Sequence, residues 1–289
     1  MLRLLPRFDA AVPDGCQVVT VWGAAGAPGR STVAVNVACE LAVAGQRVLL
    51  IDADNSSPTL AEYFGAMERP AGIVAAARLI DQGRLDIDQL NRLGLQLAFG
   101  RRSVTFLPGL PAITRWPEFA PHHLDALLEL ARDHFDFVVL DIAADLEQNL
   151  VQPHTVNERF AVGRHAIQVA DLLVGVVSAD PISVGRFIKC LPQLPQGAEP
   201  LVVVNRFRTG ALGAKPRNQL VDAFARLANL EISAFIPDEP AVFDAGLLNN
   251  LPLAMNKRAS TARVAISQFA RLHLLKERSD LDRRVAKLG

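Results

Sequence analysis

The 289-residue sequence has little of what marks several common protein classes. It contains one tyrosine and three cysteines, and Cys16, Cys39 and Cys190 lie far apart along the chain. This spacing fits neither a disulfide framework nor a cysteine metal site, and it is typical of the reduced thiols of a cytoplasmic protein. The first 15 residues lack a continuous apolar stretch, and no apolar run approaches the ~20 residues that cross a bilayer. We therefore expect a soluble, cytoplasmic protein without a secretion signal.

The chain also has no net charge and little lysine. Thirty basic residues balance thirty acidic ones, and only five of the basic residues are lysine. Such a balance provides no overall field for nucleic acid or an anionic membrane. The stretch with Arg206, Arg208, Lys215 and Arg217 leaves nonspecific DNA open as a partner, although a solvated loop is the favoured interpretation. The last ten residues place only three apolar side chains on one helical face. That is too little for stable membrane insertion, so any membrane or pole association would depend on partners.

Short apolar runs alternate with longer amphipathic segments. The apolar runs indicate strands buried on both faces of a parallel sheet, and they cover residues 17–22, 47–51, 137–140, 172–177, 201–205 and 232–236. Helical periodicity covers residues 31–45, 123–134, 182–191 and 217–228. This alternation predicts an α/β fold with a doubly wound, mostly parallel sheet. The segment 95–109 predicts an antiparallel edge hairpin. We expect a single domain over residues 16–258, with an N-terminal tail over 1–15 and a helical tail over 259–289.

The stretch GAAGAPGRST follows the first predicted strand, and two kinds of phosphate site share its glycine spacing. Gly23, Gly26 and Gly29 match the G-x-x-G-x-x-G turn of short-chain dehydrogenases. Enzymes of that class need a Tyr-x-x-x-Lys pair, but Tyr63 is the only tyrosine and Met67 stands four residues after it. That enzyme is therefore excluded, while a non-catalytic dinucleotide-binding protein stays open as an alternative.

A P-loop explains more of these residues. Such a loop needs glycines, then a cation, then a hydroxyl, because its backbone amides hold phosphates and the hydroxyl holds Mg²⁺. The stretch supplies these groups in that order, directly after a strand and at the start of a helix, with Gly26, Gly29, Arg30, Ser31 and Thr32.

Asp141 supplies the other group that a P-loop site requires, an acid at the end of a second buried strand. An unpaired carboxylate at that position would be costly without a ligand. The alternative for Ser31 is a helix-capping hydroxyl. The sequence therefore predicts a magnesium site that involves Ser31 and Asp141.

The six histidines have no metal-site spacing, and we expect His122 and His123 to point apart at the surface, at the start of a helix.

These motifs resemble those of the ParA/MinD group of deviant-Walker ATPases, and most of all the CpaE/TadZ-type members encoded with pilus-assembly genes. The family pattern K-G-G-x-G-K-T-T aligns with residues 25–32. The family's D-x-D motif corresponds to Asp52 and Asp54, and its Walker B acid to Asp141. Its base-reading strand end resembles the segment 204–206, and the segment that closes over adenine resembles 235–242. The similarity covers nearly the whole chain, roughly from residue 16 to residue 270.

The resemblance implies ATP and Mg²⁺ as cofactors and a role for each matched residue. The metal would be held by Ser31, Asp52 and Asp141. Asp54 would orient the attacking water, and Arg30 would contact the β- and γ-phosphates. The nucleotide itself would be bound by Gly26, Ala27, Pro28, Gly29, Arg30, Ser31, Thr32, Asn205, Arg206 and Pro237.

Two departures from the family pattern bear on activity. The signature lysine, which in the family reaches the nucleotide of the dimer partner, corresponds to Ala25, and the Walker lysine corresponds to Arg30. Arginine keeps the positive charge but presents a bulkier, planar group. The second glycine of the loop is replaced by Ala27. We therefore predict that ATP binding survives better than hydrolysis, which would be weak or absent.

The implied function is spatial organisation, in which the protein positions a pilus or secretion assembly in a bacterial cell. Its partners would be a second copy of the chain, forming a homodimer, or a protein of the pilus or secretion machinery. Alternatives are a nucleotide-free scaffold of the same fold and a chromosome or plasmid segregation ATPase that binds nonspecific DNA. A small-molecule ligase similar to dethiobiotin synthetase is less favoured, because no second-substrate motif is recognisable.

Overall fold

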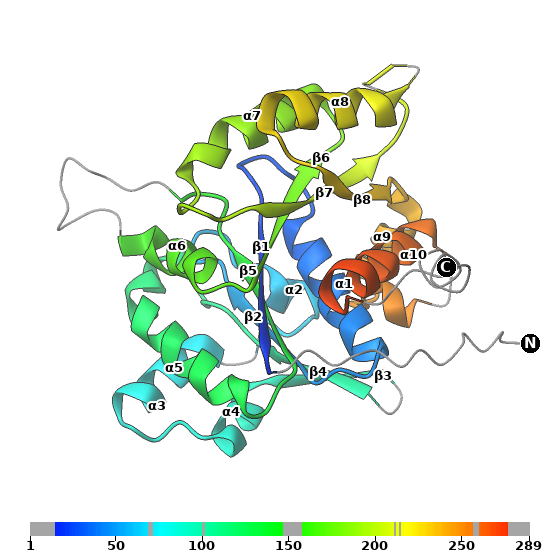
Figure 1. The fold of residues 1–289 in the computed structure, drawn as a ribbon. Helices are drawn as coiled ribbons and strands as arrows, with labels where there is room; N and C mark the ends of the chain where they lie inside the picture. The colour runs from blue at the N-terminus through cyan, green and yellow to red at the C-terminus, as the bar shows by residue number, and fades with distance from the viewer. Residues whose placement is uncertain are drawn as a thin grey trace, which may run out of the picture.

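A central eight-stranded sheet organises the protein (Figure 1). The computed structural model describes residues 15–68, 72–99, 102–146, 158–210, 212–213, 215–256 and 260–276. The strand order is β3-β4-β2-β5-β1-β6-β7-β8. In chain order the strands are β1 Gln17–Trp22, β2 Val48–Ala53, β3 Leu95–Phe99, β4 Arg102–Leu107, β5 Phe137–Ile142, β6 Leu172–Ser178, β7 Pro200–Phe207 and β8 Ile232–Pro237. All neighbouring strands are parallel except β3 and β4. The predicted mostly parallel sheet with an antiparallel pair at its edge is confirmed.

Burial along each strand follows its place in the sheet. Every residue of β2 and β5 is buried, as expected for inner strands covered on both faces. The edge strand β3 instead alternates between half-buried and exposed residues, because only one of its faces packs on the protein. The continuous apolar runs of the sequence therefore correspond to the interior of the sheet.

Helices cover both faces of the sheet (Figure 1). One core contains residues of α3 Gly72–Asp81, α5 Pro121–Arg132, α6 Ala161–Gln168, α7 Pro181–Cys190 and α8 Pro216–Ala228. The other contains residues of α1 Arg30–Val43 and α10 Thr261–Phe269. The shorter helices are α2 Leu60–Tyr63, α4 Ile87–Leu93 and α9 Pro240–Leu248. This two-sided arrangement is the doubly wound architecture that the sequence predicts.

The helix α10 belongs to the core, although the sequence places it in a tail. Ile266 and Phe269 of α10, and Leu274 and Leu275 just after it, are almost completely buried. They pack with α1 and the sheet because the helix carries an apolar stripe on one face. Arg263 forms an ion pair of 2.8 Å with the buried Glu40 of α1. The part of the expected tail that the structure describes, up to residue 276, thus packs with the domain, and the rest lies outside the described residues, as does the expected N-terminal tail up to residue 14.

Candidate functional site

The candidate site lies at the carboxyl ends of the parallel strands, where the loop between β1 and α1 meets the ends of β2, β5 and β7. Gly26 and Gly29 have φ angles of +78° and +95°, in the left-handed region that favours glycine. The amide of Ala27 donates to the carbonyl of Ala24 at 2.9 Å, which closes a turn within the loop. Gly29 stands at the N-cap of α1 and has no side chain with which to cap the first turn of that helix. The loop therefore ends at helix amides of the kind that bind an anion.

Arg30 is folded back over this loop. Its Nη1 donates to the carbonyl of Gly23 at 3.0 Å, and its Nη2 lies 3.8 Å from a carboxylate oxygen of Asp54. The Arg30 side chain is only 17% exposed, so the guanidinium faces the site and not bulk solvent. Arg30, which the sequence predicts to contact phosphates, therefore lies at the loop.

Three carboxylates converge beside the loop. Asp52 on β2 stands in register with Asp141 on β5, because the two strands are parallel neighbours. The amides of Thr59 and Leu60 donate to Asp52, and the amides of Ser56 and Ser57 donate to Asp54. All three carboxylates, of Asp52, Asp54 and Asp141, are at least 97% buried.

Asp141 differs from its two neighbours in its hydrogen bonding. Within the described residues, neither of its carboxylate oxygens accepts a hydrogen bond of ordinary geometry, and the hydroxyl of Ser31 lies close by. Burial and the charge of Asp54 raise the pKa of Asp141 to about 7, against the lowering effect of the nearby Ser31 hydroxyl and Arg30 guanidinium. Burial, followed by the charge of Asp141, also raises the pKa of Asp52 well above its usual value. The two carboxyl groups thus form an electrostatically unfavourable pair that a cation would relieve.

A cavity of about 320 Å³ continues from the loop toward β7 and α9. Asn205, at the carboxyl end of β7, donates from Nδ2 to the carbonyl of Pro28 at 3.1 Å. A Cβ on Gly29 would overlap this amide, so only glycine fits there. Four residues named from the sequence line the cavity, namely Gly29, Thr32, Asn205 and Arg206. Its other lining residues are Arg208, Asp238, Pro240, Phe243, Asp244 and Leu247.

The sequence predicts Pro237 and the segment 235–242 for this side of the site, but not Phe243, Asp244 and Leu247, which also line the cavity. Pro237 ends β8, whereas the cavity is lined by the residues that follow it, starting with Asp238. Arg208 forms an ion pair with Asp238 and so joins the ends of β7 and β8. The segment 235–242 is predicted to close over adenine, but its sequence pattern does not show which of its residues point into the cavity.

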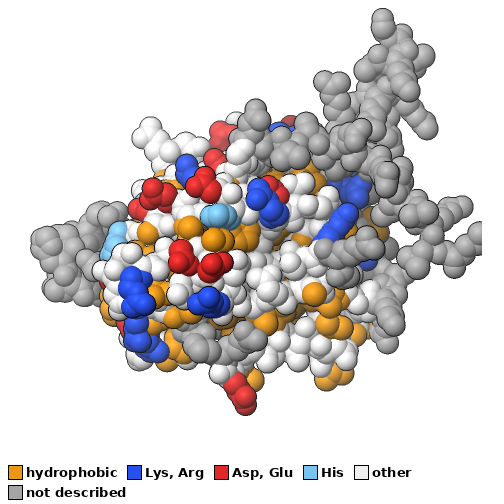
Figure 2. Space-filling model, turned by 90° about the horizontal axis from the view of Figure 1, so that it is seen from below, with side chains coloured by type: hydrophobic (Ala, Val, Ile, Leu, Met, Phe, Trp, Pro, Cys, Tyr) orange, Lys and Arg blue, Asp and Glu red, His pale blue; other side chains and the backbone are white. Residues whose placement is uncertain are grey.

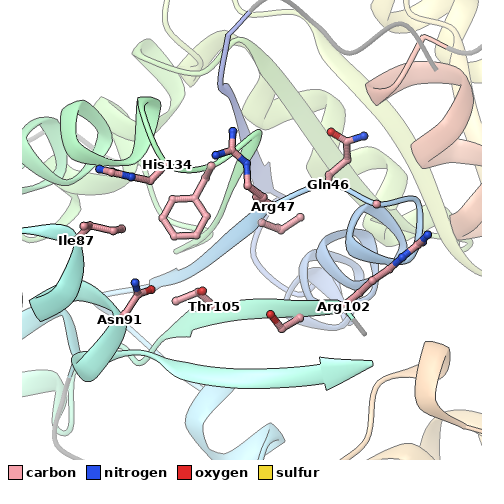
Figure 3. A pocket seen from close by; sticks show the side chains of 11 residues that line it. Gln46, Arg47, Ile87, Asn91, Arg102, Thr105 and His134 are labelled. Carbon is pink, nitrogen blue, oxygen red and sulfur yellow. The ribbon is translucent and has the colours of Figure 1, made fainter. Parts of the chain in front are cut away.

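A second cavity, of about 390 Å³, lies at the opposite end of the sheet (Figure 3). It is lined by residues at the starts of β2, β4 and β5, and by Asn91 and Ile87 of α4. Two of its polar side chains have partners within the fold, since Arg47 pairs with Asp136 at 2.7 Å and Thr105 with Gln96. None of the residues predicted from the sequence to bind nucleotide or metal lines this cavity.

The expectation that His122 and His123 point apart at the surface is wrong. Their ring centroids lie 3.8 Å apart, and His123 is buried. Nδ1 of His123 accepts from the amide of Ala120, so its Nε2 carries the proton and donates to Asp81 at 3.0 Å. Because Nε2 has no free lone pair in this arrangement, the cluster of Asp81, His122 and His123 is a hydrogen-bonded contact between α3 and α5 and not a ready metal site.

Comparison with known proteins agrees with this geometry. A profile of the CobQ/CobB/MinD/ParA nucleotide binding domain matches residues 19–253. The septum site-determining protein MinD of Thermotoga maritima is 24% identical over 243 residues, which cover 83% of this chain and 81% of the relative.

Solved structures show the same fold at low sequence identity. A ParA family ATPase from Chlorobium tepidum has a TM-score of 0.71 at 19% identity, covering 89% of this chain and 98% of that one. The septum site-determining protein MinD from Pyrococcus horikoshii, complexed with Mg-ADP, has a TM-score of 0.69 at 18% identity, covering 90% of this chain and 97% of that one.

Among the described residues, no helix is long and apolar enough to cross a bilayer.

Proposed function

Because the chain belongs to the CobQ/CobB/MinD/ParA nucleotide-binding family, we propose that it binds ATP with Mg²⁺ and acts as a spatial organiser. Its cargo would be a pilus or secretion assembly, as in the CpaE/TadZ-type members that its motifs resemble. The similarity to septum site-determining proteins, which are also spatial regulators by name, supports the general role.

The observation that carries nucleotide and metal binding is the unpartnered carboxylate of Asp141. A buried carboxylate without hydrogen bonds is unfavourable unless a ligand compensates its charge. Mg²⁺ prefers carboxylate, hydroxyl and water oxygens, and Asp141 lies near the Ser31 hydroxyl and in register with Asp52. The donor set therefore fits Mg²⁺, which would neutralise charge on the phosphates when bound.

Each part of the site has a distinct task in this proposal. The amides of the loop and of the first turn of α1 bind the phosphates, and Arg30 turns from the Gly23 carbonyl toward them. The cavity beside Asn205 and Phe243 receives the base. Asp54 is placed to orient a water molecule for attack on the terminal phosphate.

We expect ATP hydrolysis to be slow even where ATP is bound well. Arg30 lies 3.8 Å from Asp54, so the residue that would orient the water is also a partner of the phosphate cation. Position 25 of the loop is alanine, so this position has no lysine that could reach the nucleotide of a second subunit in a dimer. Binding requires mainly the backbone of the loop, whereas hydrolysis requires both side chains in their reactive positions.

The proposed partners are a second copy of the chain and a pilus or secretion protein. DNA is less favoured, because two of the four basic residues at 206–217 are engaged within the fold. Arg208 pairs with Asp238, and Arg217 stacks over the ring of Phe235 at 4.2 Å. On the face seen in Figure 2, acidic and basic side chains of the described residues are interspersed.

The test is a titration of the purified chain with ATP and Mg²⁺, with and without chelator, by calorimetry. Arg30→Ala and Asp141→Ala are the site variants, and Arg92→Ala on the exposed surface of α4 is the control. We expect wild type and control to bind ATP, Asp141→Ala to lose the Mg²⁺ dependence, and Arg30→Ala to bind on the order of tenfold more weakly. Absence of binding by wild type at millimolar nucleotide would instead favour the scaffold, and binding of NAD(H) would favour the dinucleotide alternative.

The proposed cargo needs a separate test in cells. A fluorescent fusion of the chain should concentrate at the sites of pilus or secretion assembly, and the Asp141→Ala variant should be diffuse. Cross-linking should then recover components of that machinery with wild type and not with the variant. A distribution that follows the nucleoid, with steep salt dependence of DNA binding in vitro, would favour the segregation alternative.

A further inference from the structure

A second arginine lies against the phosphate loop, from a part of the chain far away in sequence. A Cβ added to Gly26 would lie 2.5 Å from Nη1 of Arg186 and 3.8 Å from its Cζ. The guanidinium of Arg186 therefore lies against Gly26, which we call the tip of the loop together with Ala25. Because Gly26 also has a positive φ, loop and arginine fit together only with glycine at this position.

The packing of α7 determines where Arg186 lies. Phe187, the next residue, is completely buried, and its ring centroid lies 5.4 Å from that of Trp22 at the end of β1. The helix begins after Asp180, whose side chain accepts from the amide of Ser183. The amide of Ala179 donates to the carbonyl of Asn205 at 3.0 Å. The helix is thus held by the same strand ends, β1 and β7, that hold the loop and the cavity.

The two arginines at the loop differ in their surroundings. Arg30 donates to Gly23 and lies near Asp54. Arg186 is exposed, and within the described residues it has no carboxylate partner. The residue before Gly26 is Ala25, so the tip of the loop has no cation of its own. A guanidinium with unused donors at a phosphate loop has the chemistry that binds phosphate oxygens, with two parallel N–H donors.

The position along the loop indicates which phosphates Arg186 would reach. The cavity for the base is lined by Gly29 and Thr32, at the helix end of the loop. Gly26 lies further from that cavity along the chain, and with the base in the cavity this is the side on which the distal phosphates would lie. We propose that Arg186 binds the β- and γ-phosphates of the nucleotide held by its own subunit and so supplies the cation that the loop tip lacks. This inference rests on the proposed nucleotide binding and adds a phosphate-binding residue to it.

The test compares the affinities of ATP, ADP and AMP, each with Mg²⁺, for wild type and three variants of α7. Arg186→Ala removes the guanidinium, Arg186→Lys keeps a positive charge, and Lys189→Ala removes another exposed cation of the same helix as the matched control. We expect Arg186→Ala to weaken ATP and ADP on the order of tenfold while AMP changes little. Arg186→Lys should restore part of the loss, and Lys189→Ala should match wild type. Thermal unfolding without nucleotide should be the same for all four proteins, which separates phosphate binding from a structural role.

The outcomes distinguish this inference from the proposed function. If wild type binds ATP and Arg186→Ala binds it equally well, the role of Arg186 is overturned and nucleotide binding stands. Equal losses for ATP, ADP and AMP would also overturn it, because the distal phosphates would then not be the contact. A loss seen only at protein concentrations where the chain dimerises would place the arginine on the partner's nucleotide. If wild type binds no nucleotide, both proposals fail together.

Discussion

At the scale of single residues, the site combines the Arg30 guanidinium with the three buried carboxylates of Asp52, Asp54 and Asp141. Asp52 and Asp54 are hydrogen-bonded to backbone amides, and Asp141 is not. In this arrangement Asp141 weakens the nucleotide-free fold, because its charge is buried and the Ser31 hydroxyl and Arg30 guanidinium compensate only part of it. A metal ion would convert this unfavourable group into a ligand, so the same residue links stability to binding.

The stability of the metal-free protein should therefore depend on pH through Asp141. Its pKa is about 7 in the folded chain and roughly 4 in an unfolded one. As the pH rises from about 4 to about 7, the unfolded state loses the proton first, so the free energy of unfolding falls across this window. Asp141→Asn should remove most of this fall, which is on the order of 4 kcal/mol at most.

Urea unfolding of wild type and Asp141→Asn without Mg²⁺, at about pH 5 and about pH 7.5, measures this effect. The advantage of the variant should be larger at the higher pH. Asp88→Asn, at an exposed site on α4, serves as the control and should show no such difference. An advantage of Asp141→Asn that does not change with pH would contradict the assigned pKa.

At the scale of elements, the carboxylate of Glu239 joins the cavity between β7 and α9 to α10. Glu239 lies between the cavity residues Asp238 and Pro240, and it accepts hydrogen bonds from the first residues of α10. Burial would raise the pKa of Glu239, but the hydrogen bonds from Ser260 and Thr261 outweigh it and lower this pKa to about 2. Glu239 therefore stays ionised at neutral pH and caps a helix whose N-terminus favours negative charge.

Glu239→Gln should weaken this connection without removing the side chain's volume. We expect a loss of about 1 kcal/mol in the free energy of unfolding, as for the removal of other charged helix caps. Hydrogen exchange should be faster at the amides of Thr261 and Ala262 while those of β1 and β5 are unchanged. Exchange at α10 equal to that of wild type would mean that the Ser260 side chain alone, which accepts from Arg263, is a sufficient cap.

At the scale of the whole molecule, α1 connects the loop at 23–29 to the C-terminal helices. Asn36, buried in α1, donates to the carbonyl of Thr32 and accepts from the amide of Leu253. Glu40, one turn later, pairs with Arg263 of α10. Loop, sheet and C-terminal helices are therefore packed around one helix, and we expect them to unfold together.

Truncation tests how far the domain extends. A chain that ends at residue 258 would lose Ile266, Phe269, Leu274 and Leu275 from the core. Their burial is worth about 8 kcal/mol together, comparable with the whole stability of a typical domain at roughly 5–15 kcal/mol. We expect that chain to be unfolded or aggregated by circular dichroism and gel filtration, and one that ends at residue 276 to fold. A stable, monomeric chain ending at 258 would restore the boundary that the sequence suggests.

The apolar runs and turn residues of the chain are enough to predict the sheet, its hairpin edge and the chemistry gathered at the strand ends. Continuous apolar runs indicate inner parallel strands, and parallel strands bring their carboxyl ends to one edge, so the loop at 23–32 and the acids Asp52 and Asp141 had to meet. Local pattern was sufficient for these features because each one depends on a single strand or turn.

The distant side chains that complete the site, in contrast, are known only once the chain is folded. Asn205 on the Pro28 carbonyl, Arg186 on Gly26 and α10 against α1 are contacts between segments far apart in the chain. His123 is buried for the same reason, since α3 covers the start of α5 and supplies Asp81. Such contacts depend on how helices pack across the sheet, and the periodicity of a single segment carries no information about its neighbours in space.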